Sequence, residues 1–257
     1  MITYDTVNAW GVSHPWISRE QIEQDLLLSK AICEIYSNEF LSSELIFRGG
    51  TALHKLILSK PYRYSEDLDF VRTSSGGIGN IMNELTKIGI HNGFKVKTKM
   101  GQYPKVYWNY FAQTGISSKI KIEINTYERN TALPMIVIDH SVSTEWYKGS
   151  ASIKVFQTEE IAATKIRALY QRSKGRDLFD LWLLTTIAKV NPENVINAFV
   201  VYRPEDYSSK KAIENLERKL LDSRFLSDMD SLIASNELSY SVSDAATLVK
   251  EIYLEKL

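Results

Sequence analysis

Two short segments of the 257-residue sequence decide the fold: FRGGTAL at residues 47–53 and RYSEDLDF at residues 63–70. Apolar residues predict a short strand over 45–48 that ends at the Gly49–Gly50 pair, and the pattern that follows predicts a helix over 51–59. Two glycines between a strand and a helix let the backbone approach a ligand closely. The N-terminus of such a helix offers free N–H groups to a phosphate. The first segment is therefore typical of a phosphate-binding turn.

The second segment carries two carboxylates on a strand predicted over residues 67–71. Asp67 and Asp69 are two positions apart, so both side chains leave the same face of the strand. Neighbouring carboxylates repel each other, and Mg²⁺ resolves this by binding one or two carboxylates together with phosphate oxygens. A third carboxylate on a neighbouring strand would complete a site for two-metal phosphoryl chemistry, and Glu123 on the alternating segment 119–127 is the candidate. Asp-x-Asp alone is more often a solvated strand face, so the prediction depends on the combination with the glycine turn.

The rest of the chain divides into a part with helices and strands and a part with helices alone. Ser18 and Gln21 predict the capped start of a helix over 19–40. The other predicted strands of the first part are 94–100, 106–113, 119–127, 135–138 and 153–156. The predicted helices of the second part are 159–172, 177–189, 193–201, 210–221 and 244–256. This order favours an α+β or α/β domain over residues 1–156, followed by a helical domain over residues 157–257.

Composition narrows the class of protein. The chain has 44% hydrophobic and 24% charged residues, as ordinary globular proteins do, which excludes disordered and collagen-like classes. Cys33 is its one cysteine, so no intrachain disulfide can form and a reducing cytoplasm is the expected location. No apolar run approaches the length of a membrane span, so no membrane partner is expected. Lys plus Arg equals Asp plus Glu at 31 each, so any attraction to nucleic acid must be local.

Four separated segments resemble one family. Gly49-Gly50-Thr51 followed by Asp67-Leu68-Asp69 is similar to the signature of the DNA polymerase β nucleotidyltransferase superfamily. The finer pattern resembles the AbiEii/AbiGii toxin branch, which includes the MenT toxins; it adds EEIAATKIRAL at 159–169 and KGRDLFDL at 174–181. The resemblance spans about residues 47–181. It implies a nucleotidyltransferase-like α+β domain with a small mixed sheet flanked by helices, followed by an all-helical domain.

The resemblance also implies roles for the residues of the first domain. Asp67 and Asp69 would bind Mg²⁺ or Mn²⁺. Glu123 would be the third metal ligand, at a position that is usually aspartate in the superfamily. The residues implied in binding the NTP substrate are Arg48, Gly49, Gly50, Thr51, Arg63, Ser65 and Lys165.

In the second domain, the resemblance implies that Lys165 lies against the NTP phosphates. Asp177 or Asp180 would position Lys165 or the nucleotide. The implied catalytic set is Asp67, Asp69, Lys165, Asp177 and Asp180. Without the resemblance, the spacing of Arg176 and Asp180, four residues apart on a predicted helix, favours an ordinary ion pair on the helix surface.

Two basic regions are candidates for binding RNA. Residues 85–122 hold seven lysines and no acidic residue, with aromatic residues interleaved, a composition that suits RNA. Residues 161–176 form a second basic run. The candidate RNA-binding residues are Lys95, Lys97, Lys99, Arg167, Arg172, Lys174 and Arg176. The alternative for the lysine-rich strands is a solubilising face over an aromatic core.

Together these features predict a metal-dependent nucleotidyltransferase that moves a nucleoside monophosphate from NTP to an acceptor and releases pyrophosphate. The resemblance implies the toxin of a toxin–antitoxin or phage-defence system, with the 3′ end of tRNA as acceptor and a cognate antitoxin as partner. Transfer to a protein or small-molecule hydroxyl is the alternative within enzymes. A non-catalytic nucleotide-binding module is the alternative outside them.

Overall fold

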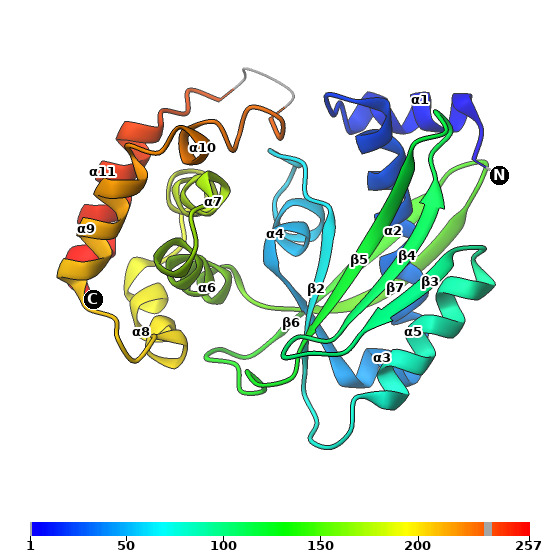
Figure 1. The fold of residues 1–257 in the computed structure, drawn as a ribbon, viewed down its shortest axis with the longest axis horizontal. Coiled ribbons are helices and arrows are strands. Elements are labelled where there is room, and N and C mark those ends of the chain that lie inside the picture. The colour runs from blue at the N-terminus through cyan, green and yellow to red at the C-terminus, as the bar shows by residue number, and fades with distance from the viewer. Residues whose placement is uncertain (1, 234–237) are drawn as a thin grey trace. The chain divides into compact units, whose positions relative to one another are not determined.

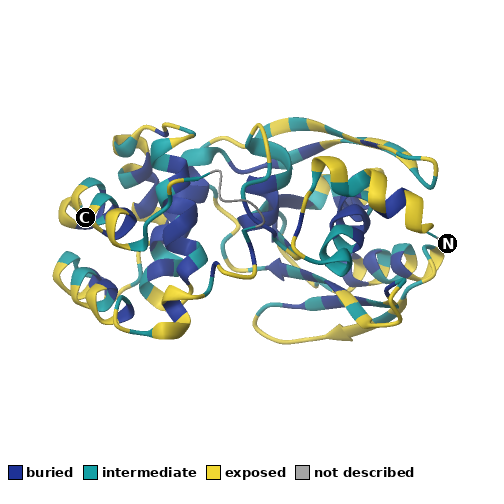
Figure 2. Ribbon diagram, turned by 90° about the horizontal axis from the view of Figure 1, so that it is seen from above, coloured by how far each residue is buried: buried dark blue, intermediate teal, exposed yellow. Residues whose placement is uncertain are grey.

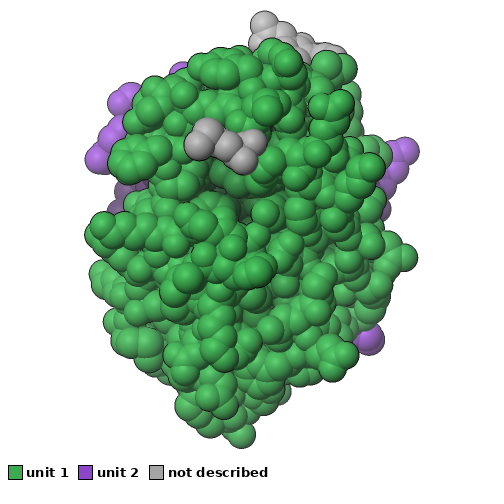
Figure 3. Space-filling model, turned by 90° about the vertical axis from the view of Figure 1, so that its right-hand side faces the viewer, with its two compact units in different colours: residues 1–130, 135–156 green, residues 131–134, 157–257 purple. Residues whose placement is uncertain are grey.

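The computed structural model describes residues 2–233 and 238–257. The chain forms two compact units: unit 1 is Met1–Asn130 with Met135–Phe156, and unit 2 is Thr131–Pro134 with Gln157–Leu257 (Figure 3). The sequence assigns Thr131–Pro134 to the first domain, but this loop groups with unit 2. The amide N–H of Ala132 donates to Oε1 of Glu160 at 2.6 Å, and Nε2 of Gln157 donates to the carbonyl of Pro134 at 2.7 Å.

Unit 1 contains a mixed sheet, as the resemblance implied, and this sheet has seven strands in the order β3-β4-β5-β2-β1-β7-β6 (Figure 1). β2 runs parallel to β5 and β1 runs parallel to β7, while the other neighbouring strands are antiparallel. The strands are Leu45–Arg48 (β1), Asp67–Arg72 (β2), Lys95–Lys99 (β3), Lys105–Phe111 (β4), Ser117–Asn125 (β5), Ile136–Ser143 (β6) and Lys148–Val155 (β7).

Helices cover the apolar face of this sheet. The helical elements of unit 1 are Tyr4–Ser13 (α1), Arg19–Tyr36 (α2), Glu39–Glu44 (α3), Gly49–Ala52 (α4), the π-helical turn Leu53–Ile57 (η1) and Gly79–His91 (α5). Leu68 and Phe70 of β2 and Ile122 of β5 are buried in one core with residues of α2 and α5. Because side chains alternate along a strand, Asp67, Asp69 and Glu123 leave the opposite face. The packing of the core therefore fixes where the charged residues lie.

The helical pattern of residues 19–40 is interrupted in the structure. The predicted cap of α2 is confirmed, since Ser18 and Gln21 form a capping box. The helix ends at Tyr36, and α3 begins after Asn38, whose side chain accepts a hydrogen bond from the N–H of Leu41 at 3.0 Å. Asn38 favours a new helix start because its side chain satisfies a free N–H group.

Two further predictions differ from the structure. The helix after β1 begins at Gly49 rather than at residue 51, and its second turn is the π-helical η1. The hairpin of β6 and β7 is much longer than the predicted strands 135–138 and 153–156. Many of its added positions are exposed and polar, so they lack the apolar pattern that marks a buried strand.

The described elements of unit 2 are helices. They are Thr158–Gln171 (α6), Gly175–Thr186 (α7), Pro192–Tyr202 (α8), Ser209–Lys219 (α9), Ser223–Leu226 (α10), Val242–Ile252 (α11) and the 3-10 turn Leu254–Lys256 (η2). Buried residues concentrate in α6 and α7, which carry the second pair of sequence motifs (Figure 2). Among the described residues, no helix has both the length and the apolar character that crossing a membrane requires.

Candidate active site

Strand register gathers six charged residues of unit 1 on one face of the sheet. β1, β2, β5 and β4 are neighbours, and residues that face each other across neighbouring strands point to the same side. The facing pairs are Arg48–Asp69, Asp67–Lys121, Asp69–Glu123 and Lys105–Glu123. The structure thus brings the three predicted metal-binding carboxylates onto adjacent strands, and it places lysines among them.

The glycine turn lies directly against Asp69. Gly49 has a φ of 82°, a conformation that side chains other than glycine rarely adopt. A Cβ atom added to Gly49 would lie 2.7 Å from Oδ2 of Asp69, and one added to Gly50 would overlap Nη2 of Arg63. Glycine is therefore required at both positions, because neighbouring side chains lie too close for a Cβ atom. Gly49 is also required by its backbone conformation.

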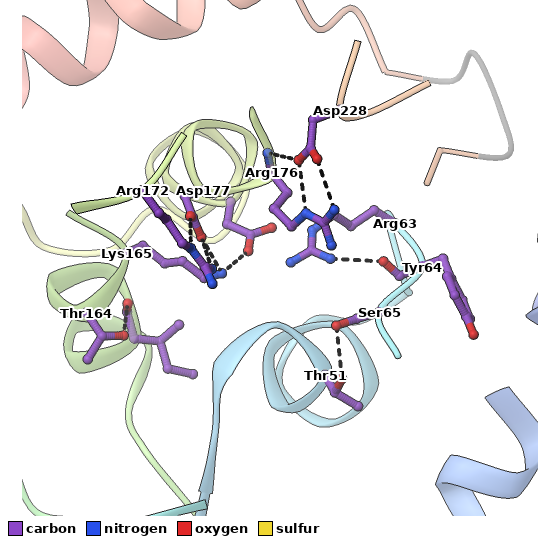
Figure 4. Close-up of polar contacts among 12 residues, drawn as sticks. Thr51, Arg63, Tyr64, Ser65, Thr164, Lys165, Arg172, Arg176, Asp177 and Asp228 are labelled. Carbon is purple, nitrogen blue, oxygen red and sulfur yellow. Dashed lines mark hydrogen bonds and ion pairs between the residues drawn. The ribbon is translucent and has the colours of Figure 1, made fainter. Parts of the chain in front are cut away.

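Thr51 and Ser65 join the glycine turn to the start of β2. The Thr51 hydroxyl lies 2.9 Å from Oγ of Ser65 and 2.5 Å from the carbonyl of Asp67 (Figure 4). Arg63 is almost fully buried, and its Nη1 donates to the carbonyl of Tyr64 at 2.9 Å. The predicted NTP-binding residues 49–51, 63 and 65 therefore form one connected set. The hydrogen bonds of Thr51 to Ser65 and to the carbonyl of Asp67 hold the turn against the start of β2.

Arg48 is positioned by an acidic residue that the sequence did not single out. Its Nη1 donates to Oε2 of Glu128 at 2.8 Å, and its guanidinium lies 6.0 Å from the centre of the Phe156 ring. These contacts fix Arg48 at the end of β1, beside Asp69. Its positive charge opposes the effect of burial, which is the main cause that raises the pKa of Asp69; the neighbouring Asp67 raises this pKa further.

The carboxylates have the charge that a divalent cation requires, and a lysine lies among them. Nζ of Lys121 lies 2.7 Å from Oδ2 of Asp67 and 3.6 Å from Oε2 of Glu123. Burial acts to lower the pKa of Lys121, but the hydrogen bond and the charges of the nearby carboxylates raise it. Within residues 2–233 and 238–257, no three or more His, Cys, Asp or Glu side chains are arranged to hold a metal ion. Asp67 and Asp69 suit Mg²⁺, which takes one or two carboxylates together with phosphate oxygens.

In unit 2, the predicted lysine and both aspartates form a buried ionic cluster. Nζ of Lys165 lies 3.0 Å from Oδ1 of Asp177 and 2.7 Å from Oδ2 of Asp180, and both aspartates are fully buried (Figure 4). Arg172 adds two hydrogen bonds to Asp177, at 2.7 and 2.9 Å. Burial acts to raise the pKa of Asp177, but Lys165 and Arg172 outweigh it and lower this pKa. The helices α6 and α7 therefore hold the Lys165 ammonium in a defined place.

The predicted ion pair between Arg176 and Asp180 is wrong. Arg176 instead makes two side-chain hydrogen bonds of 2.9 Å to Asp228, and its backbone N–H donates to the same carboxylate at 3.0 Å (Figure 4). Asp180 is occupied by Lys165. No pattern along the chain could indicate Asp228, because it lies 52 positions from Arg176.

The remaining RNA-binding candidates lie on both units. Lys95, Lys97 and Lys99 are exposed on β3, at the edge of the sheet. Arg167 lies over the ring of Tyr202, at 5.3 Å from its centre. Lys174 is exposed, with Nζ 3.8 Å from Oδ1 of Asp228.

Comparisons with known proteins identify a family and two similar solved structures. The family described as nucleotidyl transferase AbiEii toxin, type IV TA system, matches residues 30–246. A similar solved structure is MenT4, a nucleotidyltransferase toxin from Mycobacterium tuberculosis H37Rv, at 16% identity and a TM-score of 0.52, covering 97% of this chain and 99% of that one. Another is an antigenic nucleotidyltransferase-like protein from Paracoccidioides brasiliensis, at 17% identity and a TM-score of 0.40, covering 83% of this chain and 97% of that one.

A search of curated protein sequences finds no match. The similarity to MenT4 supports the nucleotidyltransferase-like fold. The family match covers most of the chain and includes all four segments that carry the resemblance. This chain is therefore a nucleotidyltransferase that belongs to the AbiEii toxin family of type IV toxin–antitoxin systems.

Proposed function

We propose that the chain transfers a nucleoside monophosphate from NTP to the 3′ end of tRNA, with a divalent metal ion held by Asp67 and Asp69. The observation that carries this proposal is the position of the glycine turn against Asp69, with Gly49 too close to that carboxylate for any side chain. This contact joins a turn that suits phosphate binding to a carboxylate that suits a metal ion.

In this reaction a bond forms between the acceptor oxygen and the α-phosphorus of the NTP. The bond from the α-phosphorus to the oxygen that bridges to the β-phosphate breaks, and pyrophosphate leaves. The metal ion would neutralise charge on the phosphate oxygens. The backbone N–H groups at Gly49–Thr51 would bind the phosphates at the helix start, and a carboxylate on this face of the sheet would take the proton of the acceptor hydroxyl. Such reactions depend on positioning and electrostatics.

We assign Lys165 to the triphosphate. Asp177, Asp180 and Arg172 hold its ammonium in place within unit 2, so little conformational freedom would be lost when a phosphate approaches. Asp177 and Asp180 are positioning residues in this proposal, because they are fully buried and act through Lys165.

RNA as acceptor is supported by the exposed lysines at positions 95, 97 and 99 of β3, which would contact phosphates. A second candidate acceptor is a protein or small-molecule hydroxyl. One observation favours it: Arg172 and Arg176, two of the residues predicted to bind RNA, form ion pairs with Asp177 and Asp228. Positive charges that are neutralised in this way attract a nucleic-acid backbone less strongly.

The experiment that tests this proposal uses each of the four α-labelled NTPs with Mg²⁺ and two acceptor pools, total tRNA and total cell protein. The expected result is a labelled tRNA band that the Asp69→Asn variant does not produce. Label on protein alone would support the second acceptor class. NTP binding without transfer to either pool would contradict the proposal. The family also implies a cognate antitoxin as a partner.

A further inference from the structure

Lys121 has an unusual place for a basic residue, since it lies among the carboxylates proposed to bind metal. Its Nζ contacts Oδ2 of Asp67 at 2.7 Å and Oε2 of Glu123 at 3.6 Å. Asp69 is the third carboxylate whose charge raises the pKa of Lys121. An ammonium between carboxylates occupies a position in which enzymes that use two metal ions need a cation.

Glu123 is held by basic residues from two strands. Nζ of Lys105 on β4 lies 3.0 Å from its Oε2, the same oxygen that Lys121 approaches. A carboxylate oxygen shared by two ammonium groups would have to lose both contacts before it could bind a metal ion. Glu123 therefore suits the role of a counter-ion to Lys105 and Lys121.

The charges of this face suit one divalent ion and no more. Asp67, Asp69 and Glu123 carry three negative charges, while Lys105 and Lys121 supply two positive ones. Arg48 is paired with Glu128 and is left out of the sum. One negative charge then remains for a metal ion and its phosphate ligands. A second divalent ion would meet the ammonium of Lys121 at short range, where repulsion is strong.

We propose that Lys121 is a built-in counter-cation that takes the place of a second metal ion, so that the site binds a single divalent ion through Asp67 and Asp69, with Glu123 outside the ligand set. This inference rests on the proposed function, because it assumes that these two aspartates bind the metal. It predicts that Lys121 weakens metal binding in the absence of nucleotide, since the ion must displace the ammonium from Asp67.

The test is a titration of the full chain with Mn²⁺ alone, in which electron paramagnetic resonance measures the free ion. We expect one Mn²⁺ that Asp69→Asn removes. Lys121→Met should tighten this binding by at least about tenfold, because a positive charge next to Asp67 is lost. The matched control is Lys119→Met, on the same strand and the same face, where the ammonium lies 5.5 Å from the centre of the Tyr107 ring. This control should keep the affinity of the wild type.

The Glu123→Gln variant tests whether Glu123 is a metal ligand or a counter-ion of the two lysines. It should weaken Mn²⁺ binding less than Asp69→Asn does if Glu123 lies outside the ligand set, because only a nearby charge is lost, whereas loss of a carboxylate ligand should weaken binding as strongly as Asp69→Asn does. The proposal is overturned if Glu123→Gln weakens binding as much as Asp69→Asn does. It is also overturned if Lys121→Met leaves the affinity unchanged or lowers it. Lys121→Gln is a second variant that keeps a polar side chain, in case methionine disturbs folding.

The assay contains no nucleotide and no acceptor, so its outcome is separate from that of the transfer assay. If the substitution at Lys121 leaves the Mn²⁺ affinity unchanged and nucleotide transfer is normal, only the proposed role of Lys121 as a counter-cation is overturned. Folded wild-type protein that binds no Mn²⁺, with or without Lys121, would overturn the proposed metal site as well.

Discussion

Gly49 and Asp69 lie so close together that a Cβ atom on the glycine would be 2.7 Å from Oδ2 of the aspartate. The register of β1 and β2 brings them together, since Asp69 is the strand partner of Arg48, the residue before Gly49. The left-handed conformation of Gly49, with a φ of 82°, turns the chain away from this contact into α4. The glycine turn and the strand that carries Asp67 and Asp69 therefore depend on each other for their positions.

Gly49→Ala should abolish nucleotide transfer. The new methyl group would displace the Asp69 carboxylate, and the backbone would pay the steric cost of a left-handed conformation, about 1–2 kcal/mol. Gly115→Ala is the matched control, since Gly115 also has a φ of 82° but a Cβ there meets no atom within 4 Å. Urea unfolding should show destabilisation of both variants, with the larger effect in Gly49→Ala, where the methyl group also meets Asp69. Full activity in Gly49→Ala would show that the close approach is not needed.

Lys165→Met should destabilise unit 2 by about 3–5 kcal/mol, because it removes one partner of a buried ionic cluster. Asp180 would lose the contact of 2.7 Å to Nζ of Lys165, while Asp177 would keep its hydrogen bonds to Arg172. Lys174→Met, at an exposed position nearby, should change stability by less than about 0.5 kcal/mol. The measurement is the free energy of unfolding in urea; equal stability of the two variants would contradict the importance of the cluster.

Lowering the pH should reduce the stability of unit 2, because Asp177 becomes protonated. Its pKa in the folded chain is lowered, because the ion pairs with Lys165 and Arg172 outweigh burial. When the pH falls, the unfolded chain therefore takes up a proton at this position first. The stabilisation is complete above the ordinary carboxyl pKa of 3.8 and is lost as the pH falls through the lowered value.

This lowered pKa predicts that the free energy of unfolding, measured by urea titration between pH 7 and about pH 2, decreases once the pH falls below the ordinary carboxyl pKa of 3.8. Asp177→Asn should be less stable at pH 7 and should lose less stability on acidification. The exposed Asp244→Asn, at the first turn of α11, serves as the control. An acid limb that is equally steep in wild type and Asp177→Asn would contradict the prediction.

Gly89→Ala should destabilise unit 1 by about 1–3 kcal/mol, the usual cost of overpacking. A Cβ at this position of α5 would lie 2.5 Å from Nε1 of Trp108 and 2.7 Å from Cγ2 of Val96. Gly79→Ala, at the start of the same helix, meets no atom within 4 Å and should be neutral or slightly stabilising. Thermal unfolding followed by circular dichroism distinguishes the two, and a stable Gly89→Ala would show that the tryptophan can move away.

Replacement of Lys95, Lys97 and Lys99 by glutamine should weaken tRNA binding and lower the dependence of affinity on salt. Loss of three phosphate contacts would reduce the slope of log affinity against log salt by about 2. The control with the same change of charge replaces the exposed lysines at positions 189, 210 and 211. Equal tRNA binding by the two variants would favour the alternative, in which these lysines form a solubilising face over an aromatic core.

Much of the fold could be predicted from local patterns. β1 matches its predicted bounds, and β2 and the helices that carry the second pair of motifs match theirs to within a few residues. The patterns failed where tertiary context decides. α2 ends early because Asn38 caps a new helix, and the long hairpin of β6 and β7 has too many polar positions to stand out as strands.

The candidate site was predictable as a list of residues but not as a set of contacts. Alternation along residues 119–124 places Lys121 and Glu123 on one face, yet only the pairing of β2 with β5 brings Lys121 to Asp67. Likewise, Asp228 could not be linked to Arg176 from local spacing. Contacts between strands and distant helices depend on register, which periodicity within one segment does not encode.

The most direct test of the central claim is the intact mass of tRNA after incubation with the chain, NTPs and Mg²⁺. Wild-type protein should add one or more nucleoside monophosphates to the 3′ end, and Asp69→Asn, shown to be folded, should add none. Unchanged tRNA with the wild type, or the same added mass with Asp69→Asn, would contradict it.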